Sequence, residues 1–184
     1  MTQYAAFLRG INLGGRTVKM AELKAVLEKL DYKNVNTFLA SGNAVFEKEP
    51  LSSPHALEME MEEALEKKFG FKIPVLVRTV EELRALKNLQ VFKDILLTPA
   101  TRFYVTFLSQ DATGSLKLPY KDPACDFCIL KLEKGALFSV MVVGEDRGTV
   151  DAMAVIEKKF GKRVTTRNWN TIERMLKCLP NYRR

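Results

Sequence analysis

The chain has 184 residues, of which 47% are hydrophobic and 28% charged, with ten glycines and seven prolines. These values are typical of a globular protein large enough to bury a core, and they exclude disordered, collagen-like and low-complexity chains. The formal net charge of +7 lies at one end, because residues 1–156 hold equal numbers of basic and acidic side chains. The basic excess of residues 157–184 favours an anionic small molecule, a nucleic acid or an acidic protein as partner, and a solvated helix face explains it as well.

From the sequence we expect no membrane span, secretory leader or disulfide framework. Its longest apolar run, residues 136–143, is far shorter than the roughly twenty residues that a bilayer crossing requires. The N-terminus reaches Arg9 too early for a secretory signal, and three cysteines are an odd number. We therefore expect a cytoplasmic protein without membrane contact.

In the first half of the chain, short apolar runs predict strands, and apolar residues repeated every three or four positions predict helices. The expected elements in chain order are a strand at 4–9, a helix at 19–30, strands at 35–40 and 44–46, a helix opened by Ser53-Pro54 and ended by Gly70, a strand at 74–78 and a helix at 79–87. The glutamates of the second helix are interpreted as its solvated face, and they are Glu58, Glu60, Glu62, Glu63 and Glu66.

This order of elements indicates a ferredoxin-like βαββαβ sheet followed by a helix, with strand order 4-1-3-2 and antiparallel neighbours. In that topology the loop after the first strand and the hairpin between the second and third strands emerge at the same end of the sheet. We therefore expect the loop of residues 9–15 and the turn Ser41-Gly42-Asn43 to lie within side-chain reach of each other.

The second half predicts a smaller α+β unit, so the fold class is α+β throughout. Its expected elements are strands at 103–108, 127–132 and 137–143, a helix at 150–160, a short strand at 164–166 and a final helix at 169–179. We place the domains at residues 1–96 and 97–184, the second with a basic C-terminal helix. The sequence of residues 66–70 recurs at 157–161, which leaves open whether the second unit is a divergent repeat of the first.

The loop after the first strand is a candidate ligand-binding segment. Its backbone N–H groups and the start of the next helix can hold an anion, Gly14 and Gly15 permit close approach, and Arg9 and Asn12 add a charge and a carboxamide. The alternative is that the glycines only turn the chain and that Asn12 satisfies loop backbone groups.

Two further polar segments join this candidate site. Ser41 and Asn43 come from the hairpin, where an ordinary turn is the alternative. Arg167 and Asn168 come from a second segment, in which the guanidinium suits two-point binding of phosphate or carboxylate and the asparagine suits helix capping. No residue is assigned a catalytic role.

The cysteines and the lone histidine indicate no metal, cofactor or nucleophile. Cys125 and Cys128 have redox-pair spacing, but a strand follows them where a redox pair needs a helix, and a zinc site lacks further ligands. We interpret them as plain thiols. His55 is the single histidine, so a Ser-His-Asp arrangement with Ser41 is not expected.

Several separated motifs resemble a known bacterial family, catalogued as Domain of Unknown Function 1697. They are residues 8–15, Val18-Lys19-Met20, Ser41-Gly42-Asn43 with Val45-Phe46, and residues 167–171. The resemblance implies an α+β fold with a ferredoxin-like N-terminal half and draws attention to the motif positions, without implying a catalytic role for any of them. The chain departs from the pattern at Arg16-Thr17 and at Ala40.

Three hypotheses about function remain at this point. The first is binding of an anionic ligand that carries phosphate or carboxylate, with nucleic acid as one candidate. The second is an enzyme that acts on a small phosphorylated or carboxylated substrate, although the motifs contain no obvious general base. The third is a protein-interaction module whose basic face meets an acidic partner. The sequence does not indicate an oligomeric state.

Overall fold

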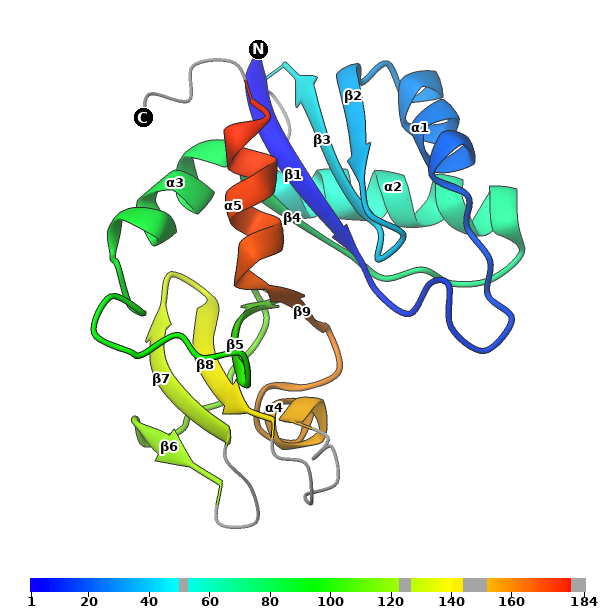
Figure 1. The fold of residues 1–184 in the computed structure, drawn as a ribbon. Helices are drawn as coiled ribbons and strands as arrows, with labels where there is room; N and C mark the ends of the chain where they lie inside the picture. The colour runs from blue at the N-terminus through cyan, green and yellow to red at the C-terminus, as the bar shows by residue number, and fades with distance from the viewer. Residues whose placement is uncertain (50–52, 123–126, 144–151, 180–184) are drawn as a thin grey trace. The chain divides into compact units, whose positions relative to one another are not determined.

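A computed structural model of the chain describes residues 1–49, 53–122, 127–143 and 152–179. It divides into two compact units, Met1–Arg84 and Ala85–Arg184 (Figure 1). Each unit contains one antiparallel sheet with helices, so the α+β class is confirmed. The placement of a domain boundary after residue 96 stays a prediction. Among the described residues, no helix is both long enough and apolar enough to cross a membrane.

The first unit follows the predicted order of elements (Figure 1). Its elements are β1 (Thr2–Leu8), α1 (Met20–Lys29), β2 (Lys33–Phe38), β3 (Asn43–Lys48), α2 (Pro54–Phe69) and β4 (Val75–Thr79), with α3 (Val80–Asn88) running on across the division of the chain. The sheet order is β2-β3-β1-β4, and each paired strand is antiparallel to its neighbour. This is the predicted order, written from the opposite edge.

The core of the first unit lies between one face of this sheet and the two helices α1 and α2. Alternate strand residues point to this face, so Tyr4 and Ala6 of β1 are buried beside their partners Phe46 and Ala44 of β3. Tyr32 adds a third aromatic ring, stacked 4.4 Å from that of Phe46. The helices contribute apolar residues at helical spacing, namely Leu23, Val26 and Leu27 from α1 and Leu57, Met61 and Leu65 from α2.

The edge strand β4 is capped by glutamate side chains, and this corrects the prediction that the glutamates of α2 form only a solvated face. The backbone N–H of Val75 donates to Glu62 Oε1 and that of Val77 donates to Glu58 Oε1, both at 2.9 Å. Glu58 is only 2% exposed. The two glutamates are four residues apart on one helix, so they meet alternate residues of an adjacent strand. The sequence prediction was wrong because spacing alone does not reveal an unpaired strand edge.

The helix α3, which follows β4 directly, has a side-chain cap at its N-terminus. Thr79 and Glu82 form a capping box, in which the Thr79 backbone N–H donates to Glu82 Oε2 at 2.7 Å and the Glu82 N–H donates to Thr79 Oγ1 at 3.1 Å. Thr79 is therefore the N-terminal cap of α3. Arg78 is also buried on this strand, and its Nη1 donates to the carbonyl of Val77 at 2.8 Å.

A buried tyrosine predicts a distinctive pH dependence of stability. The Tyr32 hydroxyl donates to Glu60 Oε2 at 2.6 Å, and Lys48 Nζ lies 3.6 Å from Glu60 Oε1. Burial raises the pKa of Tyr32, and the hydrogen bond to Glu60 and its charge raise it further. A folded-state pKa above the unfolded value of about 10 gives stability that is complete below that pH and is lost as the pH rises past it.

We therefore expect the free energy of unfolding to fall more steeply above about pH 10 in the wild type than in a Tyr32→Phe variant. Chemical denaturation at a series of pH values measures both slopes. Parallel slopes for the two proteins would show that Tyr32 titrates alike in the folded and unfolded states.

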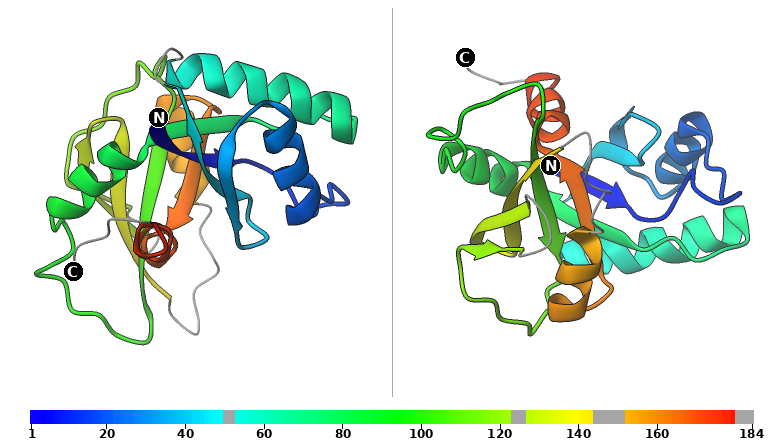
Figure 2. Two further views of the ribbon diagram at one scale, coloured as in Figure 1. Left: turned by 90° about the horizontal axis from the view of Figure 1, so that it is seen from above. Right: turned by 60° about the horizontal axis from the view of Figure 1, so that its bottom comes forward.

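The second unit is built on a sheet of order β6-β7-β8-β5-β9. Its elements are β5 (Thr101–Leu108), β6 (Tyr120–Lys121), β7 (Phe127–Glu133), β8 (Ala136–Val142), α4 (Ala152–Phe160), β9 (Val164–Asn168) and α5 (Trp169–Lys177). The left view of Figure 2 shows β5, in green, between the yellow and orange strands. The short strand β6 was not predicted, since two residues carry no detectable period.

The four strands β7-β8-β5-β9 repeat the order and directions of β2-β3-β1-β4. In both sheets the first strand of the unit is central and the last is an edge strand followed directly by a helix. This common arrangement supports the interpretation of the second unit as a divergent repeat. It also makes Arg167 of β9 the counterpart of Arg78 of β4, since each is the fourth residue of its strand.

The strand predicted at 164–166 is longer than expected. Pairing with β5 continues it to Asn168, so Arg167 lies opposite Val105 within the sheet. Trp169 then begins α5 and is buried against Phe138. Ladder hydrogen bonds to a neighbouring strand, which local sequence does not encode, explain the extension.

Candidate functional site

The loop after β1 and the turn between β2 and β3 lie side by side, as the sequence predicted. The Leu8 backbone N–H donates to the carbonyl of Gly42 at 2.8 Å, and the Asn12 side chain donates to the carbonyl of Ala40 at 2.7 Å. Gly42 packs so closely that a Cβ atom there would lie 2.5 Å from Ile11 Cδ1. The two segments therefore form one structure at this end of the sheet.

The Asn12 side chain joins the two ends of the loop and binds the neighbouring hairpin. Besides the bond to Ala40, its Nδ2 donates to the carbonyl of Val18 at 3.2 Å, and its Oδ1 accepts from the Val18 N–H at 2.9 Å. Its φ of 56° lies in the left-handed region that asparagine tolerates better than most residues. Both hydrogens of the carboxamide are thus donated to backbone, as in the alternative in which Asn12 only satisfies loop backbone groups.

The hairpin turn uses its polar side chains in the same way. Asn43 is completely buried, and its Nδ2 donates to the carbonyl of Phe38 at 2.8 Å and to Ser41 Oγ at 3.0 Å. Ser41 is exposed. These contacts shape the turn.

The charged and glycine residues of the loop lie nearer to solvent. Gly14 and Gly15 are exposed, have positive φ and have nothing within 4 Å of an added Cβ atom. Arg9 is half-buried, and Arg16 is exposed with its guanidinium 5.7 Å from the ring centroid of Phe71. These residues can attract an anion to the loop.

Arg167 is buried in the sheet of the second unit. Its Nη1 donates to Thr165 Oγ1 at 2.8 Å and to the carbonyl of Thr166 at 2.9 Å, and the residue is 8% exposed. Burial lowers the pKa of Arg167 to about 10. Arg78 makes the matching contact to Val77, and burial lowers its pKa too, against the opposing effect of Glu82 and Glu58. The shared contact indicates that both arginines cap a carbonyl of their edge strands.

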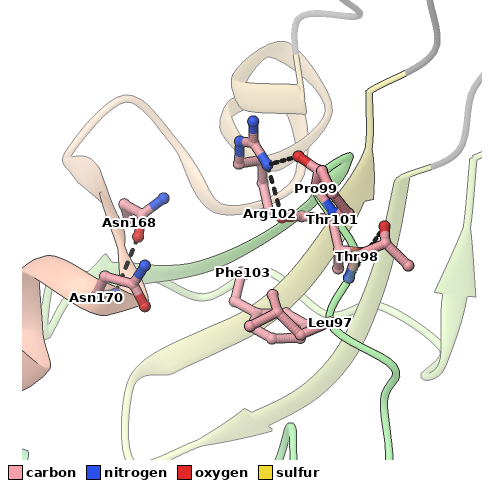
Figure 3. Close-up of a pocket in the computed structure, with 8 residues that line it drawn as sticks. All are labelled: Leu97, Thr98, Pro99, Thr101, Arg102, Phe103, Asn168 and Asn170. Carbon is pink, nitrogen blue, oxygen red and sulfur yellow. Dashed lines mark hydrogen bonds between the residues drawn. The ribbon is translucent and has the colours of Figure 1, made fainter.

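A cavity of about 490 Å³ lies at the start of β5 and the junction of β9 with α5 (Figure 3). Its lining residues are Leu97, Thr98, Pro99, Thr101, Arg102, Phe103, Asn168 and Asn170. Asn168 is the one residue of the predicted site among them. Among the described residues that line it none is acidic, so an anion meets no like charge from them.

The polar groups of this cavity are mainly donors. The Arg102 guanidinium donates from Nη1 to the carbonyls of Pro99 at 2.6 Å and Thr101 at 2.9 Å. Its Nη2 and Nε make no hydrogen bond within the described ranges. Asn168 Oδ1 accepts from the Asn170 N–H at 2.9 Å, and this bond turns the Asn168 amide nitrogen away from α5 (Figure 3). Unused donors from two strands thus meet around one space.

The chain matches the family described as protein of unknown function (DUF1697) over residues 1–125. It belongs to that family. Among solved structures, the DUF1697 chain is similar to a conserved bacterial protein from Streptococcus pneumoniae, with a TM-score of 0.66 and 23% sequence identity. The similarity covers 95% of this chain and 96% of the other, and at this identity it shows a common fold. No curated protein matches the chain.

Sequence reasoning missed most of the cavity of this DUF1697 protein. Arg102 immediately precedes the strand predicted at 103–108, and Thr98 lies between the helix predicted at 79–87 and that strand, so neither carried a motif signal. Asn170 was within the motif at 167–171 but was not assigned to the candidate site. The pairing of Tyr104 with Asn168 brings these segments together, and only the sheet register reveals it.

The remaining candidates take ordinary positions. Cys128 is half-buried, and burial raises the pKa of its thiol while the charge of Lys121 lowers it. Cys125 lies outside the described residues. His55 Nδ1 lies 3.5 Å from Glu58 Oε2 at the start of α2. Of the basic C-terminal segment, Arg183 and Arg184 also fall outside the described residues.

Proposed function

We propose that this protein binds a small anionic ligand, bearing phosphate or carboxylate, in the cavity lined by Arg102, Asn168 and Asn170. One observation carries the proposal: an arginine and two asparagines line a cavity together, with donors that no described residue uses and no acidic side chain among the described lining residues. A guanidinium offers two parallel donors to such a group, and carboxamides add neutral ones. The cytoplasm is the proposed location.

The chemistry of the lining favours binding over acid–base catalysis. The polar residues of the lining are arginine, asparagine and threonine, and the part of the chain that the structure describes adds no His, Asp, Glu, Lys, Cys or Tyr to it. A general base with a pKa near neutrality is therefore not among these residues. The enzyme hypothesis would need a base from elsewhere, so the binding function is the one that these residues support best.

The proposal predicts that Arg102 dominates affinity for a small anion. We expect an Arg102→Met variant to bind inorganic phosphate about tenfold more weakly than the wild type or worse, because a charge-assisted bidentate contact is lost. Backbone amide shifts in nuclear magnetic resonance titrations measure the affinity and locate the site, which should include residues 98–103 and 168–170.

A matched control is Arg174→Met, because Arg174 is exposed in the last turn of α5 and does not line the cavity. This variant should bind phosphate as the wild type does. An equal loss of phosphate affinity in the two variants would show that only the net charge of the protein matters, and it would overturn the assigned site. If phosphate shifts no amide of the cavity, the anion-binding proposal fails and the protein-interaction hypothesis is favoured.

Nucleic acid as the ligand makes a separate prediction. Binding of a short oligonucleotide should weaken steeply with salt, since counterions are released as phosphates are neutralised. A flat salt response would exclude the polyanion version and leave the small anion.

A further inference from the structure

One side of the same cavity is apolar. Leu97, Pro99 and Phe103 line it together with the polar residues. Figure 3 shows the Phe103 ring and Leu97 away from the Arg102 guanidinium, so the cavity has a charged part and an apolar part. A site for inorganic phosphate alone would need only the charged part.

The apolar part is packed against neighbouring rings, because Phe103 belongs to an aromatic cluster. Its ring stacks on that of Phe92 with centroids 4.4 Å apart and an interplanar angle of 17°. Phe92 in turn meets Phe138 and Trp169 edge-on, each at 5.8 Å. Phe138 is completely buried and Trp169 is 8% exposed. These contacts pack the Phe103 ring against Phe92, and Phe103 contributes an apolar surface to the cavity.

Leu97 completes this surface from the segment before β5. Its side chain is 69% exposed, and a ligand that covers it removes apolar area from water. The neighbouring Leu96 is 80% exposed but does not line the cavity. The two leucines therefore differ in one property that an experiment can use, which is access to the cavity.

We infer that the ligand joins its anionic group to an apolar group, as an aryl or alkyl phosphate or carboxylate does, with the anion at Arg102 and the apolar group against Phe103 and Leu97. This inference rests on the proposed anion-binding function. A cavity of about 490 Å³ is within the usual range for small-molecule sites. Burial of an apolar group there contributes favourable binding free energy, which a polar sugar or glycerol group does not provide.

The test compares three probes of similar charge by calorimetric titration of the full chain: inorganic phosphate, glycerol phosphate and phenyl phosphate. We expect phenyl phosphate to bind about tenfold more tightly than the other two, which corresponds to about 1.4 kcal/mol. A Leu97→Ser variant should lose most of this preference and keep its affinity for glycerol phosphate. The control Leu96→Ser should retain the preference.

The possible outcomes separate the two proposals. Equal binding of all three probes, with dependence on Arg102, would overturn the apolar subsite and leave the anion site intact. A preference for phenyl phosphate that survives in Leu97→Ser would also overturn the placement of the apolar group. Binding of none of the probes would overturn the anion site and this inference with it.

Discussion

A Gly42→Ala variant should be destabilised by about 3–5 kcal/mol, the largest effect of any single methyl group that we predict. Gly42 has a φ of 76°, where an L side chain is strained, and its new Cβ would lie 2.5 Å from Ile11 Cδ1 and 2.9 Å from Leu8 Cβ. The Cβ of Leu8 is held by the backbone of β1 and cannot rotate away. Strain and overlap therefore add at this position.

Gly15 provides the matched control for this prediction. Its φ of 84° imposes the same kind of backbone strain, but nothing lies within 4 Å of an added Cβ atom. Gly15→Ala should cost only about 1 kcal/mol in urea denaturation of the full chain. Similar losses for the two variants would show that the loop and the turn do not pack as described, since only the overlap at Gly42 distinguishes them.

A Glu58→Ala variant should lose about 3 kcal/mol of unfolding free energy. The carboxylate is buried, accepts from the Val77 N–H at 2.9 Å and offsets the burial of the Arg78 charge. Alanine removes the acceptor and the neighbouring negative charge together. The loss therefore combines an unsatisfied backbone donor with a less well compensated buried cation.

Two further variants separate these contributions in the same denaturation experiment. Glu58→Gln keeps an oxygen for the Val77 N–H, so it should cost distinctly less than alanine. Glu63→Ala, at an exposed position of α2, should change stability by less than about 0.5 kcal/mol. A loss in Glu58→Gln as large as in Glu58→Ala would assign the effect to the charge beside Arg78 and contradict the edge-capping role.

Elements whose local signals agree with one another could be predicted from the sequence. The helix α2 begins at Pro54 after the Ser53 cap and ends before Gly70, which has the left-handed φ of 79° expected of a helix stop. The capping box of Thr79 and Glu82 is equally local. From the order of such elements, the sheet topology and the convergence of the loop with the Ser41–Asn43 turn followed.

The roles of individual polar residues were less predictable. Asn12 and Asn43 were candidate ligand contacts. In the structure, however, their side-chain N–H groups donate to the backbone carbonyls of Ala40 and Phe38. Glu58 was assigned to solvent, yet it caps a strand edge. Asn12 binds Ala40 of the hairpin and Glu58 binds a backbone N–H of β4, so these two partners lie in other segments. A side chain's chemistry does not reveal which backbone group needs it.

By itself, the sequence determined the α+β class, the strand order of the first sheet and the meeting of two polar segments, because hydrophobic period, caps and turns are local properties that restrict the possible topologies. The family was indicated separately, by the resemblance of the sequence motifs. The tertiary structure decided where the donors remain unused. Strand register brings Arg102, Asn168 and Asn170 around one cavity and draws Arg167 into the sheet. Register is set by packing of whole faces, which no single segment encodes.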